Sequence, residues 1–217
     1  MKDEHALREA ICRFAQSLYA RGLTAGASGN ISARTADGGL LVTPTGSSFG
    51  FLDPACLSRF DAAGRWVDGD KPTKEMPLHS AFYDTRPDKT GAVVHLHSSH
   101  SVAWSMVPEV DPDDVLPPLT AYSVMRLGKV KLLPYFRPGD PAMGEAVRGL
   151  AGKRSAVLLA NHGPVVAAKD LEAAVYAMEE LEETAKLALL TRGCHPRLLN
   201  AAQVRDVVDT FDVEWDD

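Results

Sequence analysis

The sequence predicts an α/β domain in which helices cover a mostly antiparallel sheet. Three observations indicate this class: helix patterns near both ends, short strand patterns with tight turns in the middle, and no linker, repeat or low-complexity segment that would divide the chain. With 217 residues, 45% of them hydrophobic, the chain is long enough for one large domain with a full core. We therefore expect residues 1–217 to form a single domain.

The first part of the chain combines a long helix pattern with short strand pairs. Residues 4–21 place apolar side chains on one helical face, and Gly22 ends that pattern. Two hairpins are expected next, with strands at 31–34 and 40–43, and then at 56–60 and 65–67. A helix should follow at 76–85, where Pro77 suits the first turn.

The second part of the chain alternates buried strand patterns with helices. The expected strands are 92–97, 130–133 and 155–162, and the expected helices are 141–150, after Asp140 as N-cap, and 171–190, between Asp170 and Gly193. Residues 107–118 are rich in Asp and Pro and predict a surface loop. The last helix carries an acidic run that we interpret as a solvated face: Glu179, Glu180, Glu182 and Glu183.

Composition excludes several classes of function. A formal net charge of −6 argues against general binding to nucleic acid or anionic membranes, although a local cluster of donors can still bind a small anion. The three isolated cysteines form neither a disulfide framework nor a CxxC zinc site. The charged N-terminus lacks the apolar core of a signal peptide, and no apolar run approaches the roughly 20 residues of a membrane helix. We therefore expect a cytoplasmic protein.

Three histidines at strand ends predict a metal site. His95 and His97 are two residues apart, so on a strand their side chains emerge on the same face. His162 ends a second apolar strand pattern. A single histidine at a strand end is usually a hydrogen-bonded structural residue, but three that leave a fourth position open are typical of a catalytic metal site. His100 follows the start of an expected helix and should cap or line the pocket rather than bind the metal.

Donor-rich loops predict an anion site. Gly29-Asn30, Thr45-Gly46 and Thr73-Lys74 each lie in a loop of glycines, hydroxyls or cations, and such loops can together hold one phosphate. Glu75 follows the third loop at the expected start of a helix. It is a candidate acid/base beside a metal, and the alternative is a first-turn glutamate that interacts only with the helix dipole.

Taken together, these motifs resemble the class II aldolase/epimerase family of L-fuculose-phosphate aldolase and L-ribulose-5-phosphate 4-epimerase. The residues that carry the resemblance are Gly29-Asn30, Thr45-Gly46, Pro72-Thr73-Lys74-Glu75, His95-Leu96-His97 and Asn161-His162-Gly163. The resemblance implies a three-layer fold, with a central mostly antiparallel sheet between helices. It also implies a homotetramer with active sites near subunit interfaces.

The resemblance also implies roles for individual residues. One zinc ion per subunit, replaceable by manganese or cobalt, would be held by His95, His97 and His162. Glu75 would be the acid/base and a fourth ligand. The implied substrate contacts are Gly29, Asn30, Thr45, Gly46, Thr73 and Lys74. A tyrosine from a neighbouring subunit donates a proton in the aldolases, and whether Tyr122 is its counterpart stays open.

One departure from the aldolases points to a particular branch. Where they carry a second small hydroxyl residue before the glutamate, this chain has Lys74. Together with the segments 119–128, 134–140 and 178–186, this residue resembles the 3-oxo-tetronate 4-phosphate decarboxylases. The implied reaction is a zinc-dependent carboxy-lyase step, which passes through a metal-stabilised enediolate to dihydroxyacetone phosphate and CO2. The alternatives are a sugar-phosphate aldolase or epimerase, and a catalytically inactive interaction domain.

Overall fold

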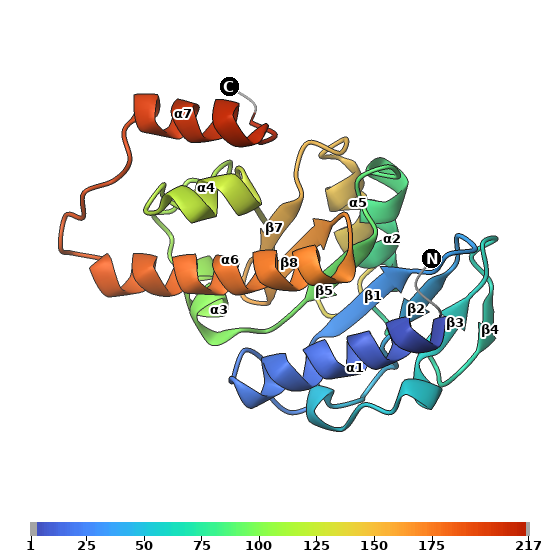
Figure 1. The fold of residues 1–217 in the computed structure, drawn as a ribbon. Coiled ribbons are helices and arrows are strands. Elements are labelled where there is room, and N and C mark those ends of the chain that lie inside the picture. The colour runs from blue at the N-terminus through green and yellow to red at the C-terminus, as the bar shows by residue number, and fades with distance from the viewer. Residues whose placement is uncertain (1–3, 216–217) are drawn as a thin grey trace.

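The computed structural model describes residues 4–215. Its strands are β1 (Asn30–Arg34), β2 (Leu40–Val42), β3 (Ser58–Phe60), β4 (Trp66–Asp68), β5 (Ala92–His95), β6 (Lys131–Leu133), β7 (Ala156–Leu159) and β8 (Gly163–Ala168). They form one sheet of eight strands in the order β4-β3-β2-β1-β5-β8-β7-β6 (Figure 1). Only the β6–β7 pair is parallel among these strands, so the expected mostly antiparallel sheet is confirmed.

Helices cover both faces of this sheet. They are α1 (Glu4–Ala20), α2 (Met76–Thr85), α3 (Ser99–Ser105), α4 (Ala121–Leu127), α5 (Ala142–Arg148), α6 (Leu171–Thr191) and α7 (Ala201–Phe211), with short 3-10 turns at Phe49–Phe51 and Pro54–Cys56. On one face α1 and α6 pack on side chains such as Ile31 and Val94. On the other face α2 and α5 pack on Val93 and Val165. Two cores on opposite faces confirm the three-layer arrangement (Figure 1).

Strand alternation decides which face each residue of β1 and β5 meets. Val94 belongs to the core under α1 and α6, whereas Val93 belongs to the core under α2 and α5. His95 is therefore directed to the α2 side of the sheet. In the neighbouring strand β1, Asn30 is the partner of His95 across the antiparallel ladder. Asn30 and His95 thus share the face of the sheet that α2 covers.

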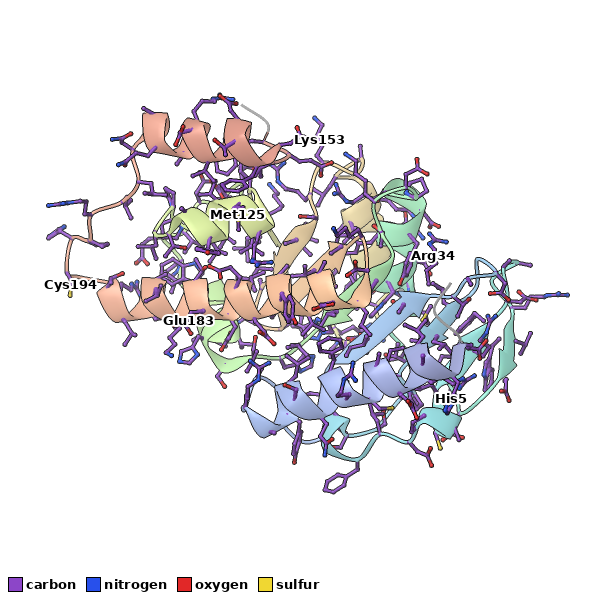
Figure 2. The ribbon with its side chains drawn as sticks, viewed as in Figure 1. His5, Arg34, Met125, Lys153, Glu183 and Cys194 are labelled. Carbon is purple, nitrogen blue, oxygen red and sulfur yellow. The ribbon has the colours of Figure 1, made fainter. Side chains whose placement is uncertain are left out.

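Three elements were not predicted from the sequence. Strand β8 begins directly at Gly163, α4 follows Thr120 as N-cap, and α7 starts at a capping box between Asn200 and Gln203. Helix α7 packs on α4 through a small apolar cluster, and Figure 2 shows Met125 of α4 in the layer between α6 and α7. Within residues 4–215, no helix is both long and apolar enough to cross a membrane.

Two sequence interpretations need correction. The acidic run on α6 is not uniformly solvated, because Glu182 is buried and accepts hydrogen bonds from the backbone N–H groups of His100 and Ser101 at the start of α3. This carboxylate thus satisfies free N–H groups at a helix N-terminus. Helix α5 begins at Ala142, and Pro141 occupies the N-cap position expected for Asp140. The Asp140 carboxylate still accepts from the Ala142 N–H at 3.0 Å.

Candidate metal centre and adjoining cavity

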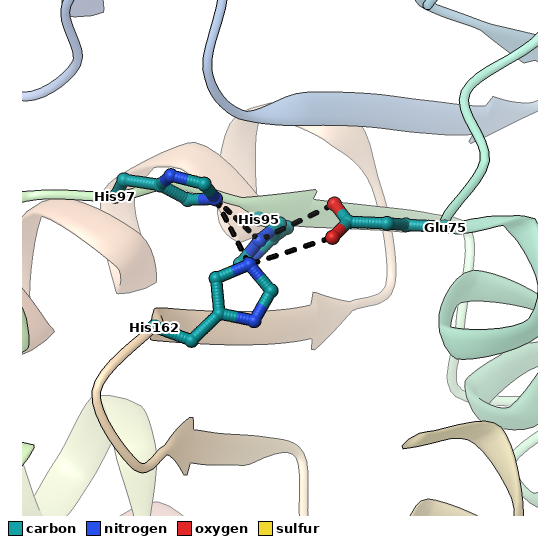
Figure 3. A group of neighbouring side chains, drawn as sticks. All are labelled: Glu75, His95, His97 and His162. Carbon is teal, nitrogen blue, oxygen red and sulfur yellow. Dashed lines mark hydrogen bonds and ion pairs between the residues drawn. The ribbon is translucent and has the colours of Figure 1, made fainter. Parts of the chain in front are cut away.

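Four side chains from three parts of the chain converge at one end of the sheet. Glu75 is the N-cap residue of α2, His95 ends β5, His97 lies two residues further on, and His162 lies in the turn between β7 and β8. Their ligand atoms all lie within 4.8 Å of one another (Figure 3). The structure thus brings together the four residues whose types and spacing suggested a metal site.

The backbone around His97 and His162 differs in detail from the expected strand ends. Strand β5 ends at His95, but Leu96 still donates from its N–H to the Pro164 carbonyl at 3.2 Å, so the chain continues alongside β8. His97 therefore remains on the face of His95. Strand β7 ends at Leu159, and His162 is presented by a tight turn in which Asn161 has a φ of 57°.

A glycine lets this turn approach the segment that carries His97. Gly163 has a φ of 156°, and a Cβ there would lie 2.2 Å from the Leu96 carbonyl oxygen. Any other residue would therefore push the β7–β8 turn away from β5. His162 can reach the other histidines because the chain has no side chain at this position.

The distances between the ligand atoms fit a single small cation. His97 Nε2 lies 3.1 Å from the Nε2 atoms of both His95 and His162. Glu75 Oε2 lies 3.4 Å from His95 Nε2, and Glu75 Oε1 lies 3.4 Å from His162 Nε2. Ligands at about 2.0–2.1 Å from a tetrahedral ion lie roughly 3.3 Å apart. The side chains therefore have the spacing of a nitrogen-rich divalent metal site with one carboxylate.

A hydrogen bond orients His95 as a ligand, and burial favours the neutral form of all three imidazoles. His95 Nδ1 donates to the Pro164 carbonyl at 2.8 Å, which leaves the lone pair of Nε2 directed into the cluster. Burial lowers the pKa of His95 to about 4. Burial also lowers the pKa values of His97 and His162. Neutral imidazoles at physiological pH are the form that binds a metal.

Glu75 is held as a carboxylate although it is buried. Burial by itself would raise its pKa, but the His95 imidazole and a hydrogen bond from Asn30 outweigh that effect and keep the pKa below its usual value. Asn30 donates from Nδ2 to Oε2 at 2.7 Å. Three neutral imidazoles and one carboxylate form a donor set that suits a divalent cation.

A cavity of about 430 Å³ adjoins the cluster, with Glu75 and His97 in its wall. The residues predicted to contact substrate all line it: Gly29, Asn30, Thr45, Gly46, Thr73 and Lys74. The three donor-rich loops are thus assembled around one space next to the candidate metal centre. That these residues contact a phosphate remains a prediction.

Two glycines shape the walls of this cavity. Gly29 has a φ of 83°, and a Cβ there would lie 2.9 Å from the His95 carbonyl oxygen, so only glycine lets the first loop lie against β5. Gly139 leaves room for Lys74, since a Cβ at position 139 would lie 3.1 Å from the Lys74 Cγ and Cδ atoms. The loop after β6 therefore supports the lysine stem, and Pro138 of that loop also lines the cavity.

Some polar residues near the centre were missed or placed differently by sequence reasoning. His100 lies outside the four-residue cluster, as expected, but it does not line the adjoining cavity, and its Nδ1 is 2.8 Å from Glu182 Oε1. Behind Glu75 and Asn30, the buried side chains of Ser32, His79 and Tyr83 form a polar group that the sequence analysis did not identify. The available signal was the four-residue spacing from Glu75 to His79 and on to Tyr83.

Comparison with known proteins adds information about family and fold. The family model described as Class II Aldolase and Adducin N-terminal domain matches residues 9–189. A 3-oxo-tetronate 4-phosphate decarboxylase of Cupriavidus necator is 46% identical over 219 residues, which cover 99% of this chain and 100% of the relative. An L-fuculose phosphate aldolase of Methanococcus maripaludis is 36% identical over 178 residues, which cover 82% of this chain and 91% of the relative.

Solved structures share this fold. The crystal structure of YgbL from Escherichia coli superposes with a TM-score of 0.91 at 46% identity, covering 94% of this chain and 98% of that one. The helix layers and the eight-stranded sheet are therefore those of an experimentally determined fold.

Proposed function

Because the chain belongs to the class II aldolase and adducin N-terminal domain family, we propose that it is a decarboxylase of a 3-oxo-tetronate 4-phosphate. The observation that carries the proposal is the 46% identity with a relative of that name over 99% of this chain. The cluster of Glu75, His95, His97 and His162 beside a donor-lined cavity supports it, since a metal could stabilise the enediolate and the donors could hold the phosphate. In this proposal residues 1–217 act as one catalytic domain.

The proposed metal is zinc, with manganese or cobalt as functional substitutes. His95, His97 and His162 would hold it, and Glu75 would be a fourth ligand in the resting site. A three-histidine set with one oxygen ligand suits zinc. When bound, the ion supplies Lewis-acid stabilisation of the negative charge that develops on the substrate oxygens.

The residues of the cavity would orient the substrate and manage its charges. Thr45, Gly46 and Thr73 offer hydroxyl and backbone donors to the phosphate, and Lys74 adds a cation next to them. The substrate carboxylate departs as CO2 when the bond from carbon 1 to carbon 2 breaks, and the electron pair passes into an enediolate over carbons 2 and 3. Carbon 2 then takes up one proton that comes from water. Glu75, a carboxylate at rest, would receive this proton and pass it to carbon 2, which yields dihydroxyacetone phosphate.

An assay for CO2 release tests this assignment. The purified protein should convert a 3-oxo-tetronate 4-phosphate to equal amounts of CO2 and dihydroxyacetone phosphate, and it should cleave L-fuculose 1-phosphate poorly. The two epimers at carbon 2 of the substrate should be tested side by side. Efficient aldol cleavage without CO2 release would overturn the proposal in favour of a sugar-phosphate aldolase, and no activity on either class would favour an inactive interaction domain.

Lys74 is expected to distinguish decarboxylation from aldol cleavage. A decarboxylase substrate carries a carboxylate as well as a phosphate, so an additional cation should stabilise it where the aldolases have a hydroxyl. One charge-assisted contact is worth roughly 1.5–3 kcal/mol, or about 10- to 150-fold in substrate capture. Lys74→Ser should therefore lower kcat/KM for the oxo-tetronate phosphate by about that factor.

Lys71 provides the matched control for this experiment. It lies in the same loop and is exposed, but it does not line the cavity. Lys71→Ser should keep wild-type kinetics. Equal kcat/KM in wild type, Lys71→Ser and Lys74→Ser would show that Lys74 is only a solvated surface lysine.

We also propose that the enzyme is a homotetramer with active sites near its subunit interfaces. The family resemblance supports this assembly. Light scattering at micromolar concentration should return the mass of four chains. The mass of a single chain would refute the assembly without affecting the proposed chemistry.

A further inference from the structure

A buried column of polar side chains connects strand β1 to helix α2 behind the candidate metal centre. Ser32 and His79 are fully buried, and Asn30, Glu75 and Tyr83 are each at most 6% exposed. Five polar side chains so deep in a protein of this size need an explanation, because each would be costly to bury without a partner. They satisfy one another in an ordered sequence.

The column arises from matched repeats in a strand and a helix. Alternate residues of β1 point to the α2 face, which selects Asn30, Ser32 and Arg34. Residues four apart lie on one face of a helix, which selects Glu75, His79 and Tyr83. Two strand residues span about 6.6 Å and four helical residues about 6.0 Å, so the two rows stay in step over this distance.

The hydrogen bonds run from the active site inward. Asn30 donates from Nδ2 to the Glu75 carboxylate at 2.7 Å. The Asn30 Oδ1 atom is in hydrogen-bond contact with His79 Nε2. His79 Nδ1 lies 2.7 Å from Ser32 Oγ, which in turn lies 2.9 Å from the Tyr83 hydroxyl. Arg34 closes the column with its guanidinium 4.8 Å from the centre of the Tyr83 ring.

Only one arrangement of protons satisfies this whole column. A carboxylate can only accept, so Asn30 must turn its NH2 group toward Glu75 and its oxygen toward His79. His79 must then carry its proton on Nε2, which leaves Nδ1 to accept from the Ser32 hydroxyl. Ser32 in turn accepts from the Tyr83 O–H. The His79 ring is fully buried, which favours its neutral form with a single proton, and the hydrogen bond to Asn30 places that proton on Nε2.

We propose that His79 is a positioning residue that locks the Asn30 amide, and through it the Glu75 carboxylate, in the orientation needed for proton transfer. Asn30 also lines the substrate cavity, and its amide nitrogen carries a second hydrogen that can meet a ligand there. A reversed amide would place Oδ1 against the carboxylate and remove both donors. The inference rests on the proposed function only for the identity of the reaction.

A double-mutant cycle tests whether His79 acts through Asn30. His79→Leu removes the donor while keeping a buried side chain of similar size, and misplacement of the proton-transfer group should lower kcat/KM by about 10- to 100-fold. His79→Gln keeps an N–H near the position of Nε2 and should restore most of that loss. In an Asn30→Ala background, His79→Leu should cost nothing further.

Readouts other than activity separate positioning from a general loss of structure. His79→Leu should still bind about one metal ion per chain, because His79 is not in the cluster of candidate ligands. Tyr83→Phe, which removes only the last hydroxyl of the column, should have the smallest effect on kcat/KM. Additive losses of activity from His79→Leu and Asn30→Ala, or losses that merely follow a falling Tm, would overturn the proposal.

The position of the His79 proton can be measured in the wild-type protein without an activity assay. Nitrogen-15 NMR of the zinc-loaded protein should show the His79 ring protonated on Nε2 and unprotonated on Nδ1. A proton on Nδ1 would contradict the column even if all variants were inactive. Failure of the proposed function is a different result, since it would appear as absent CO2 release in a protein that still shows this ring state.

Discussion

Replacing Glu75 with glutamine is expected to leave the fold and the cavity intact and to remove nearly all turnover. Glutamine keeps the size of the side chain but can neither accept nor deliver the proton needed at carbon 2. Loss of one general acid/base typically costs about 10²–10⁴-fold in rate. The environment of Glu75 supports this role, because it is 4% exposed and held as a carboxylate between two histidines and Asn30.

The experiment needs a readout for the proton as well as for the rate. In D2O the wild-type enzyme should place one deuterium stereospecifically on the hydroxymethyl carbon of the product. Any residual product of Glu75→Gln should lose that stereospecificity, because water would then deliver the proton from either face. Glu109→Gln is a suitable control, since Glu109 is an exposed partner of Arg192 outside the cavity. If Glu75→Gln kept the wild-type rate and the stereospecific labelling, Glu75 would not be the acid/base. It would then act only as a residue at the start of a helix.

Periodic patterns made most of the fold predictable. The continuous apolar run in Ala92–His95 identified a buried strand, and the two-residue spacing of its histidines placed His95 and His97 on the same face. The helix pattern after Asp170 likewise identified α6, whose N-cap bond from Ala173 to Asp170 is present. Strand β8 was missed because it starts with Gly163-Pro164, which is a turn signal by composition. Its partners β5 and β7 make it a strand despite that start.

Contacts between distant segments were the part that the sequence could not predict. Glu182 looked like one more solvated glutamate, and only the docking of α3 on α6 shows that it caps a helix. The sequence analysis assigned no role to His79, and only the packing of α2 against β1 gives it a partner 49 residues away. The candidate metal residues were easier to find, because their residue types are few and the family resemblance supplies their order.

Replacing His97 with alanine is expected to remove the metal and with it the activity. His97 Nε2 lies 3.1 Å from the Nε2 atoms of both other histidines, so its ring bridges the candidate ligand set. Loss of an outer hydrogen bond to a metal ligand typically costs about 10- to 100-fold in affinity, and loss of a ligand should cost more. The metal content measured by elemental analysis should therefore fall from about one ion per chain to a small fraction of that value.

Thermal stability gives a second readout of the same loss. Metal that binds only the folded state stabilises it, by about 4 kcal/mol when its free concentration is 1,000 times Kd. EDTA should therefore lower the Tm of the wild-type protein but barely change that of His97→Ala. His100→Ala is the matched control, because His100 lies three residues away and contacts Glu182 outside the candidate ligand set. It should keep both the metal and the response to EDTA. If His97→Ala kept its full metal content and turnover, the His97 imidazole would not be a metal ligand. The catalytic ion would then have to bind elsewhere.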